Sequence, residues 1–95
     1  MEFVAIDVET ANANLSSICQ IGIVRFVDSM PAEQWKTLVN PNDFFDWMNV
    51  SIHGIDENTV ADAPSWPDII DKVRAMTNGN IVVSHGSFDR SAIDR

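Results

Sequence analysis

Residues 2–8 read EFVAIDV, a run of apolar and β-branched side chains that is typical of a strand inside a sheet. Two carboxylates, Asp7 and Glu9, stand at the end of this run. Side chains two residues apart on a strand point to the same side of the sheet. Two like charges placed there are costly unless something compensates them, and a hard divalent cation such as Mg²⁺ or Mn²⁺ does so. The pair therefore predicts a metal site.

The same pair has a plainer interpretation, since Asp-x-Glu is a common tripeptide that can simply end a strand in solvent. A second feature joins it, because residues 84–89 read SHGSFD just after the short apolar strand predicted at 81–83. Loops at the carboxyl ends of strands are where sites gather in α/β sheets. Asp89 would lie there at a helix N-terminus, a place that also favours an ordinary acidic residue.

Two more strands follow the first one. Residues 11–17, with two Asn and two Ser, predict a loop, and residues 18–27 predict a second strand. Its apolar residues fall on both faces, which indicates a central, covered strand. Residues 28–31 predict a turn, and residues 34–39 a third strand that closes an antiparallel meander.

The second half of the chain adds a crossover. Residues 40–64 are expected to be irregular. A helix is expected from the N-cap Ser65 to the stop at residues 78–80, because apolar residues then recur at helical spacing. A helix that enters the strand at 81–83 implies a strand parallel to an earlier one. Another helix is expected from Phe88. The expected fold class is α/β, an incomplete mixed sheet with a helix on one face.

Composition sets further bounds. The 95 residues predict one domain at most, and 14 acidic against 6 basic residues give a net charge of −8. This charge argues against broad binding of a phosphate backbone, but an enzyme can hold phosphates through bound metal ions. The single cysteine, Cys19, is expected to be a small buried hydrophobe. No signal peptide or membrane span is visible, so a soluble cytoplasmic protein without membrane association is expected.

Several segments resemble one family in the same order along the chain. Residues 3–10 (FVAIDVET) are similar to the first motif of the DEDD 3′→5′ exonucleases, and residues 18–24 to the strand that follows it. Asn40-Pro41, His53-Gly54-Ile55 and Asp62-Ala63-Pro64 resemble the middle segment, and residues 83–89 (VSHGSFD) the second motif. The family includes the proofreading epsilon subunit of bacterial DNA polymerase III, ribonuclease T and oligoribonuclease. The resemblance covers essentially the whole chain.

The resemblance implies a ribonuclease H-like fold and a site with two Mg²⁺ or Mn²⁺ ions. Asp7 would bridge both ions, Glu9 would bind the ion that activates water, and Asp89 would complete the site. Thr10, His53, His85 and Phe88 are the expected substrate-binding residues. For His53 a structural role in a turn is the first interpretation. The reaction would be hydrolysis of the terminal 3′ phosphodiester of single-stranded DNA or RNA, releasing nucleoside monophosphates, as in an epsilon-like proofreader.

The chain departs from the family pattern in two places. Ser84-His85-Gly86 stands where the second motif more often has His-Asn-Ala, and the third motif, which supplies a catalytic His and a last Asp, is absent. Residues 1–95 are therefore expected to be the N-terminal part of one exonuclease domain, inactive alone. The expected partners are a nucleic-acid 3′ end and a DNA polymerase subunit. A catalytically inactive interaction module is the alternative, and a homodimer could cover the incomplete sheet.

Overall fold

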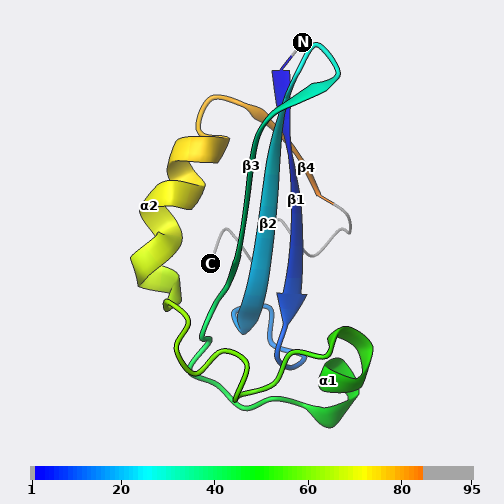
Figure 1. The fold of residues 1–95 in the computed structure, drawn as a ribbon, viewed down its shortest axis with the longest axis vertical. Helices are drawn as coiled ribbons and strands as arrows, with labels where there is room; N and C mark the ends of the chain where they lie inside the picture. Colours follow the sequence, from blue (N-terminus) through cyan, green and yellow to red (C-terminus); the bar gives the residue numbers. More distant parts are fainter. Residues whose placement is uncertain (1, 85–95) are drawn as a thin grey trace.

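The computed structural model describes residues 2–84, which form one mixed sheet and two helices (Figure 1). The elements are β1 (Glu2–Thr10), β2 (Ile18–Val27), β3 (Met30–Leu38), α1 (Trp47–His53), α2 (Trp66–Thr77) and β4 (Ile81–Ser84). The strand order is β3-β2-β1-β4. The strands β1, β2 and β3 are antiparallel neighbours, and β4 runs parallel to β1. The predicted meander and parallel strand are confirmed, while the helix expected from Phe88 lies outside the described residues.

The β2–β3 hairpin is tighter than predicted. Its two turn residues, Asp28 and Ser29, have φ angles of 49° and 70°. Positive φ at both central residues is the mark of a type I′ turn, whose twist matches that of the flanking strands. As a result β3 begins at Met30, four residues before the predicted start at 34. Pro31 is tolerated because β3 is an edge strand of the described sheet, where a missing backbone N–H costs little.

Helix α2 begins where its sequence indicates. The backbone N–H and the hydroxyl of Ser65 both donate to Asp68 Oδ2, at 3.0 Å each, and Pro67 occupies the first turn. This reciprocal capping satisfies donors that the first turn leaves unpaired. The helix buries Ile69 and Val73, together with one later residue of the same face, against the sheet.

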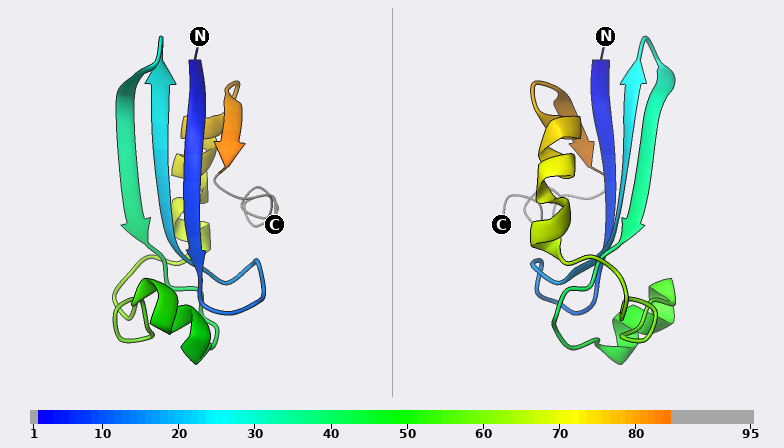
Figure 2. Two further views of the ribbon diagram at one scale, coloured as in Figure 1. Left: turned by 90° about the vertical axis from the view of Figure 1, so that its right-hand side faces the viewer. Right: turned by 60° about the vertical axis from the view of Figure 1, so that its left-hand side comes forward.

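The main core lies between α2 and one face of the sheet (Figure 2). On β1 every second side chain enters it, and on β2 the two side chains Ile21 and Ile23 are completely buried. Strand β2 is central, as predicted; among the described residues α2 covers one of its faces, and Cys19 near its start packs with Ile55 and Val60. The core consists of Val4, Ile6, Val8, Ile18, Ile21, Ile23, Val39, Ile69, Val73 and Met76.

Helix α1 contradicts the prediction that residues 40–64 are irregular. It begins after Asp46, whose Oδ1 accepts the N–H of Met48 at 2.9 Å, and it ends at Gly54 with φ 74°. None of its residues is buried. A helix without a buried stripe has no apolar period of 3.6, so the pattern gave no signal. It lies beyond the end of the sheet where β1 ends (Figure 1).

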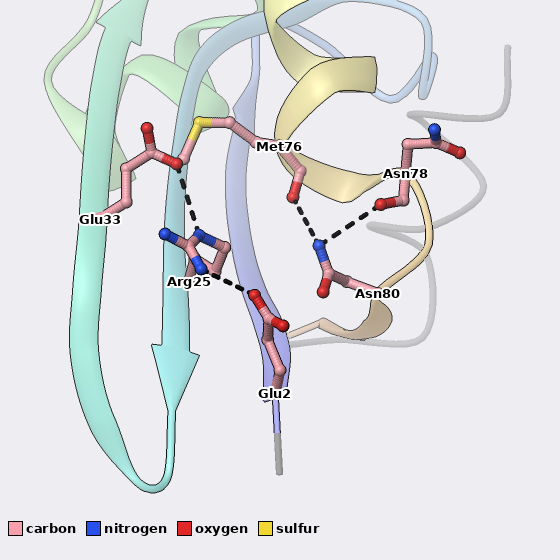
Figure 3. A network of polar contacts seen from close by, with 6 residues as sticks. All are labelled: Glu2, Arg25, Glu33, Met76, Asn78 and Asn80. Carbon is pink, nitrogen blue, oxygen red and sulfur yellow. Dashed lines mark hydrogen bonds and ion pairs between the residues drawn. The ribbon is translucent and has the colours of Figure 1, made fainter.

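The opposite end of the sheet is held by polar contacts (Figure 3). Arg25 Nη1 contacts Glu2 Oε1 at 2.7 Å, and Arg25 Nε contacts Glu33 Oε1 at 3.6 Å. Asn80 Nδ2 donates to the carbonyl of Met76 at 3.2 Å. These contacts connect the three antiparallel strands and fasten the turn from α2 into β4. Neither described helix has the length and apolarity that crossing a bilayer requires.

Candidate metal and nucleic-acid site

The carboxylates Asp7 and Glu9 lie on the face of the sheet opposite to α2. Along β1 they alternate with buried core residues such as Ile6 and Val8, as the two-residue period requires. Both line one open pocket of about 280 Å³. The prediction that the two side chains share a face is therefore confirmed. The pocket is lined by Ala5, Ile6, Asp7, Glu9, Gln20, Gly22, Val24, Lys36 and Val83.

Register places the residues of this pocket in rows across the strands. Asp7 pairs with Gly22, which pairs in turn with Lys36. Glu9 pairs with Gln20. Directly paired residues of antiparallel strands share a face, so one row runs from a carboxylate over a glycine to an ammonium group. Because Gly22 has no side chain, it forms a low floor between the two charged neighbours.

Among the described residues, the carboxylate oxygens that line the pocket suit a hard divalent cation. Asp7 is exposed and Glu9 is half-buried, so carboxylate oxygens are available to an ion in the pocket. Mg²⁺ and Mn²⁺ prefer such oxygen ligands. Within residues 2–84 no third His, Cys, Asp or Glu joins the two to form a metal-binding group. The third predicted ligand, Asp89, lies outside the described residues, as do His85 and Phe88.

Thr10, a predicted substrate-binding residue, is tied to α1 through its backbone. Its carbonyl oxygen lies 2.8 Å from His53 Nε2 and accepts the Asn49 side-chain amide at 3.1 Å. His53 Nδ1 accepts the backbone N–H of Ile55 at 3.0 Å. This acceptor role assigns the proton to Nε2, which therefore donates to Thr10. His53 thus has the structural role that was its first interpretation, and substrate binding by Thr10 and His53 stays a prediction.

Further contacts hold the loop that follows Glu9. The side-chain amide of Asn12 donates to the carbonyl of Phe44 at 2.8 Å, and Asp46 N–H donates to the carbonyl of Ala11 at 2.8 Å. Asn12 is 3% exposed, which makes it one of the few buried polar residues. Segment 44–53 therefore positions the end of β1 from outside the sheet. Nothing local in the sequence signals these pairings, because the partners lie more than thirty residues apart.

Cys19 is fully buried, as predicted. It packs with Ile55 and Val60 in a second apolar cluster, and its Sγ lies 4.0 Å from His53 Nε2. Burial, with a smaller contribution from the negative charge of Glu9, raises the pKa of the Cys19 thiol to about 11. The thiol therefore stays protonated at neutral pH and is an apolar filler rather than a nucleophile.

The aromatic residues divide between core and surface. Trp66 packs against the main core, as its helical spacing predicts, and Trp35 does the same from β3. Phe45 packs against the second cluster. In contrast, Trp47 is 75% exposed on α1 and Phe44 is exposed just before it.

Comparison with known proteins points to one enzyme family. The exonuclease family RNase_T matches residues 4–95. The chain is 33% identical over 95 residues to a PolC-type DNA polymerase III of Caldanaerobacter subterraneus subsp. tengcongensis, covering 97% of this chain and 7% of that protein. It is 25% identical over 95 residues to the DNA polymerase III epsilon subunit of Buchnera aphidicola subsp. Baizongia pistaciae, covering 90% of this chain and 39% of that protein.

Solved structures agree with the fold. Exonuclease X in complex with 5′-overhanging duplex DNA superposes with a TM-score of 0.76 at 28% identity, over 98% of this chain and 51% of that one. A full-length 3′-exonuclease gives a TM-score of 0.76 at 20% identity, over 95% and 36% of the two chains, which shows the fold alone. The predicted ribonuclease H-like fold is confirmed, although the chain spans only about half of these proteins or less. The chain belongs to the RNase_T family of exonucleases, the DEDD type that its motifs resemble.

Proposed function

We propose that the pocket at the end of β1 is part of the active site of a metal-dependent 3′→5′ exonuclease. The observation that carries this proposal is the joint lining of one open pocket by Asp7 and Glu9 in a chain of the exonuclease family. The alternative of a non-catalytic interaction module is not favoured. No observation on residues 2–84 requires it, whereas two converging carboxylates without an ion only repel each other.

Asp7 and Glu9 would hold the divalent ions, with Asp89 as the third ligand. When bound, such ions supply an activated water and stabilise the leaving oxygen. The chain's own contribution is positioning. Strand β1 aims both carboxylates into the same pocket, and the hydrogen bonds of Asn49 and His53 to the Thr10 carbonyl fix the backbone that follows them. Carboxylates that are already held in position need no reorganisation when the substrate binds.

DNA with a single-stranded 3′ end is the proposed substrate, with nucleoside monophosphates as products. The names of the relatives support DNA over RNA, because they are DNA polymerase III proteins and an exonuclease solved with duplex DNA. A DNA polymerase subunit is the proposed partner on the same ground. Nothing among the described residues supports the homodimer, which stays a prediction.

The test is an Mn²⁺-dependent cleavage assay on 5′-labelled single-stranded DNA and RNA. It is run on the 95-residue chain and on a chimera that joins this chain to the part of Exonuclease X that it does not cover. We expect the chimera to shorten DNA from its 3′ end and Asp7→Ala to abolish this activity. The matched control is Asp71→Ala, which removes the same charge from the exposed side of α2.

A chimera that keeps its activity after Asp7→Ala would overturn the proposed site. Shortening from the 5′ end, seen with a 3′-labelled strand, would overturn the polarity. A ladder produced by the 95-residue chain alone would support the site and contradict the expectation that this chain is inactive by itself.

A further inference from the structure

Lys36 occupies the side of the pocket that faces the two carboxylates. It lies on β3 in the row Asp7–Gly22–Lys36, two strands from Asp7. Neighbouring strands are about 4.8 Å apart, so the Cα atoms of Asp7 and Lys36 are separated by roughly 10 Å. A lysine side chain spans more than half of that distance. The ammonium group can therefore reach the space above Gly22, beside any group held at the carboxylates.

Gly22 is what allows this approach. A Cβ atom at this position would lie 3.9 Å from Lys36 Cγ and 4.0 Å from the backbone oxygen of Asp7. The side chain of Lys36 therefore already leans over the glycine. A larger residue at this place would occupy the floor of the pocket and push the lysine stem away.

The other cations of the described chain point elsewhere. Arg25 forms ion pairs with Glu2 and Glu33 at the end of the sheet opposite to α1 (Figure 3). Lys72 and Arg74 belong to α2, which packs on the opposite face. Within residues 2–84, Lys36 forms no ion pair and is the cation that lines the carboxylate pocket. It also lines two further hollows, one with Gln34 and one with Asn58 and Asp62.

We infer that Lys36 binds a phosphate group of the nucleic-acid strand whose end lies at Asp7 and Glu9, an inference that rests on the proposed function. A chain with net charge −8 repels a polyanion. A cation that forms no ion pair among residues 2–84, and that lines the pocket of Asp7 and Glu9, counters this repulsion where the strand must approach. Lys36 is thus a substrate-binding residue that positions the strand next to the reacting linkage.

A structural role offers the competing explanation. Lysines on edge strands hinder edge-to-edge pairing of sheets, and β3 is an edge strand of the described sheet. A lysine with this role alone would affect self-association. It would leave the salt dependence of nucleic-acid binding unchanged, because only phosphate contacts release counterions.

The experiment measures the binding of a fluorescent single-stranded DNA to the 95-residue chain by anisotropy, with Mn²⁺ and at several salt concentrations. A gel run after each titration checks that the strand is intact. Lys36→Met keeps the apolar stem and removes the charge, Lys36→Arg restores the charge, and Lys72→Met is the charge-matched control on α2. We expect Lys36→Met to weaken binding about two- to fivefold and to lower the slope of log K against log salt by about 0.7. Lys36→Arg and Lys72→Met are expected to keep the slope.

A second series locates the contact. Single phosphates, counted from the 3′ end, are replaced by neutral methylphosphonates. One position is expected to weaken binding of the original chain but not of the Lys36→Met variant, since the two changes remove the same contact.

If the slope of log K against log salt is the same for Lys36→Met and Lys72→Met, the inference is overturned while the proposed function stands. Self-association of Lys36→Met with an unchanged slope would also overturn it and assign the lysine to edge protection. If the original chain binds no strand at any salt concentration, and the chimera releases no nucleotides, the proposed function fails and the inference fails with it.

Discussion

The two faces of the sheet are built from the same strands but serve opposite purposes. On the face under α2, β1 and β2 present buried aliphatic residues such as Val4, Ile21 and Ile23. On the other face the alternate positions of these strands present Asp7, Glu9 and Gln20 around an open pocket. Neighbours in sequence thus differ completely in environment. Burial of each aliphatic side chain contributes about 1.5–3 kcal/mol, so the covered face maintains the fold.

This division shows why two charges are tolerated beside a core. The covered face holds the strands rigid, and the open face can carry groups that contribute nothing to packing. Changes on the two faces are therefore expected to separate stability from binding. Four predictions test that separation.

Ile21→Ala is expected to destabilise the chain by about 2–5 kcal/mol, because a fully buried side chain leaves a cavity under α2. Val24→Ala, on the open face of the same strand, is the matched control and is expected to cost about 1 kcal/mol or less. Urea denaturation followed by circular dichroism measures both values. Similar losses for the two variants would contradict the division of the faces.

Mn²⁺ is expected to stabilise the original chain through Asp7. An ion at about one hundred times its dissociation constant adds about 2.7 kcal/mol to the free energy of unfolding, which thermal denaturation records as a rise in Tm. Asp7→Asn is expected to remove this rise and to change stability little when no metal is present. Asp71→Asn is the control that keeps the rise. A metal response that survives Asp7→Asn would place the ion elsewhere.

Gly22→Val is expected to change the free energy of unfolding by about 1 kcal/mol or less, while it weakens binding of single-stranded DNA. Its branched side chain fills the floor of the pocket and displaces Lys36. Gly22→Ala is the control, because a single Cβ at 3.9 Å and 4.0 Å from its neighbours is in ordinary contact. Urea denaturation and anisotropy report the two effects separately. Unchanged DNA binding by the valine variant would show that binding does not depend on the open space over Gly22.

Alkaline pH is expected to lower the stability of the fold through Cys19, which lies in the second apolar cluster. Burial raises the pKa of its thiol from the ordinary value of 9.0 to about 11. Between these values the folded chain keeps a proton that the unfolded chain releases. The contribution to stability is therefore complete below pH 9.0 and is lost as the pH rises through about 11. The chain has no tyrosine to obscure the effect.

The measurement is the urea midpoint at pH values below 9.0 and near 11, compared with Cys19→Ala. The alanine variant is expected to start from a lower stability and to lose less of it with pH. Equal pH dependence in the two chains would show that the thiol does not titrate differently on folding.

Local patterns predicted most of the elements, and the residues explain where they failed. Helix α2 carries a periodic apolar signal and a clear cap, and strand β2 is a long apolar run, so the bounds of both agree closely with the prediction. Helix α1 was not predicted because none of its residues is buried and its apolar residues, Trp47 among them, form no buried stripe. The early start of β3 was missed because Pro31 is a turn signal in most contexts.

The alternation of β1, the acidic pair on one of its sides and the order of the family's motifs can all be read from the amino-acid sequence alone. These are properties of neighbouring residues and of strand geometry. Which residues lie across the sheet from that pair depends instead on the folded arrangement of the strands. The register brings Gly22 and Lys36 into the row of Asp7, and α1 brings Asn49 and His53 to the Thr10 carbonyl. Such pairings depend on strand register and on the packing of distant segments, which no local pattern specifies.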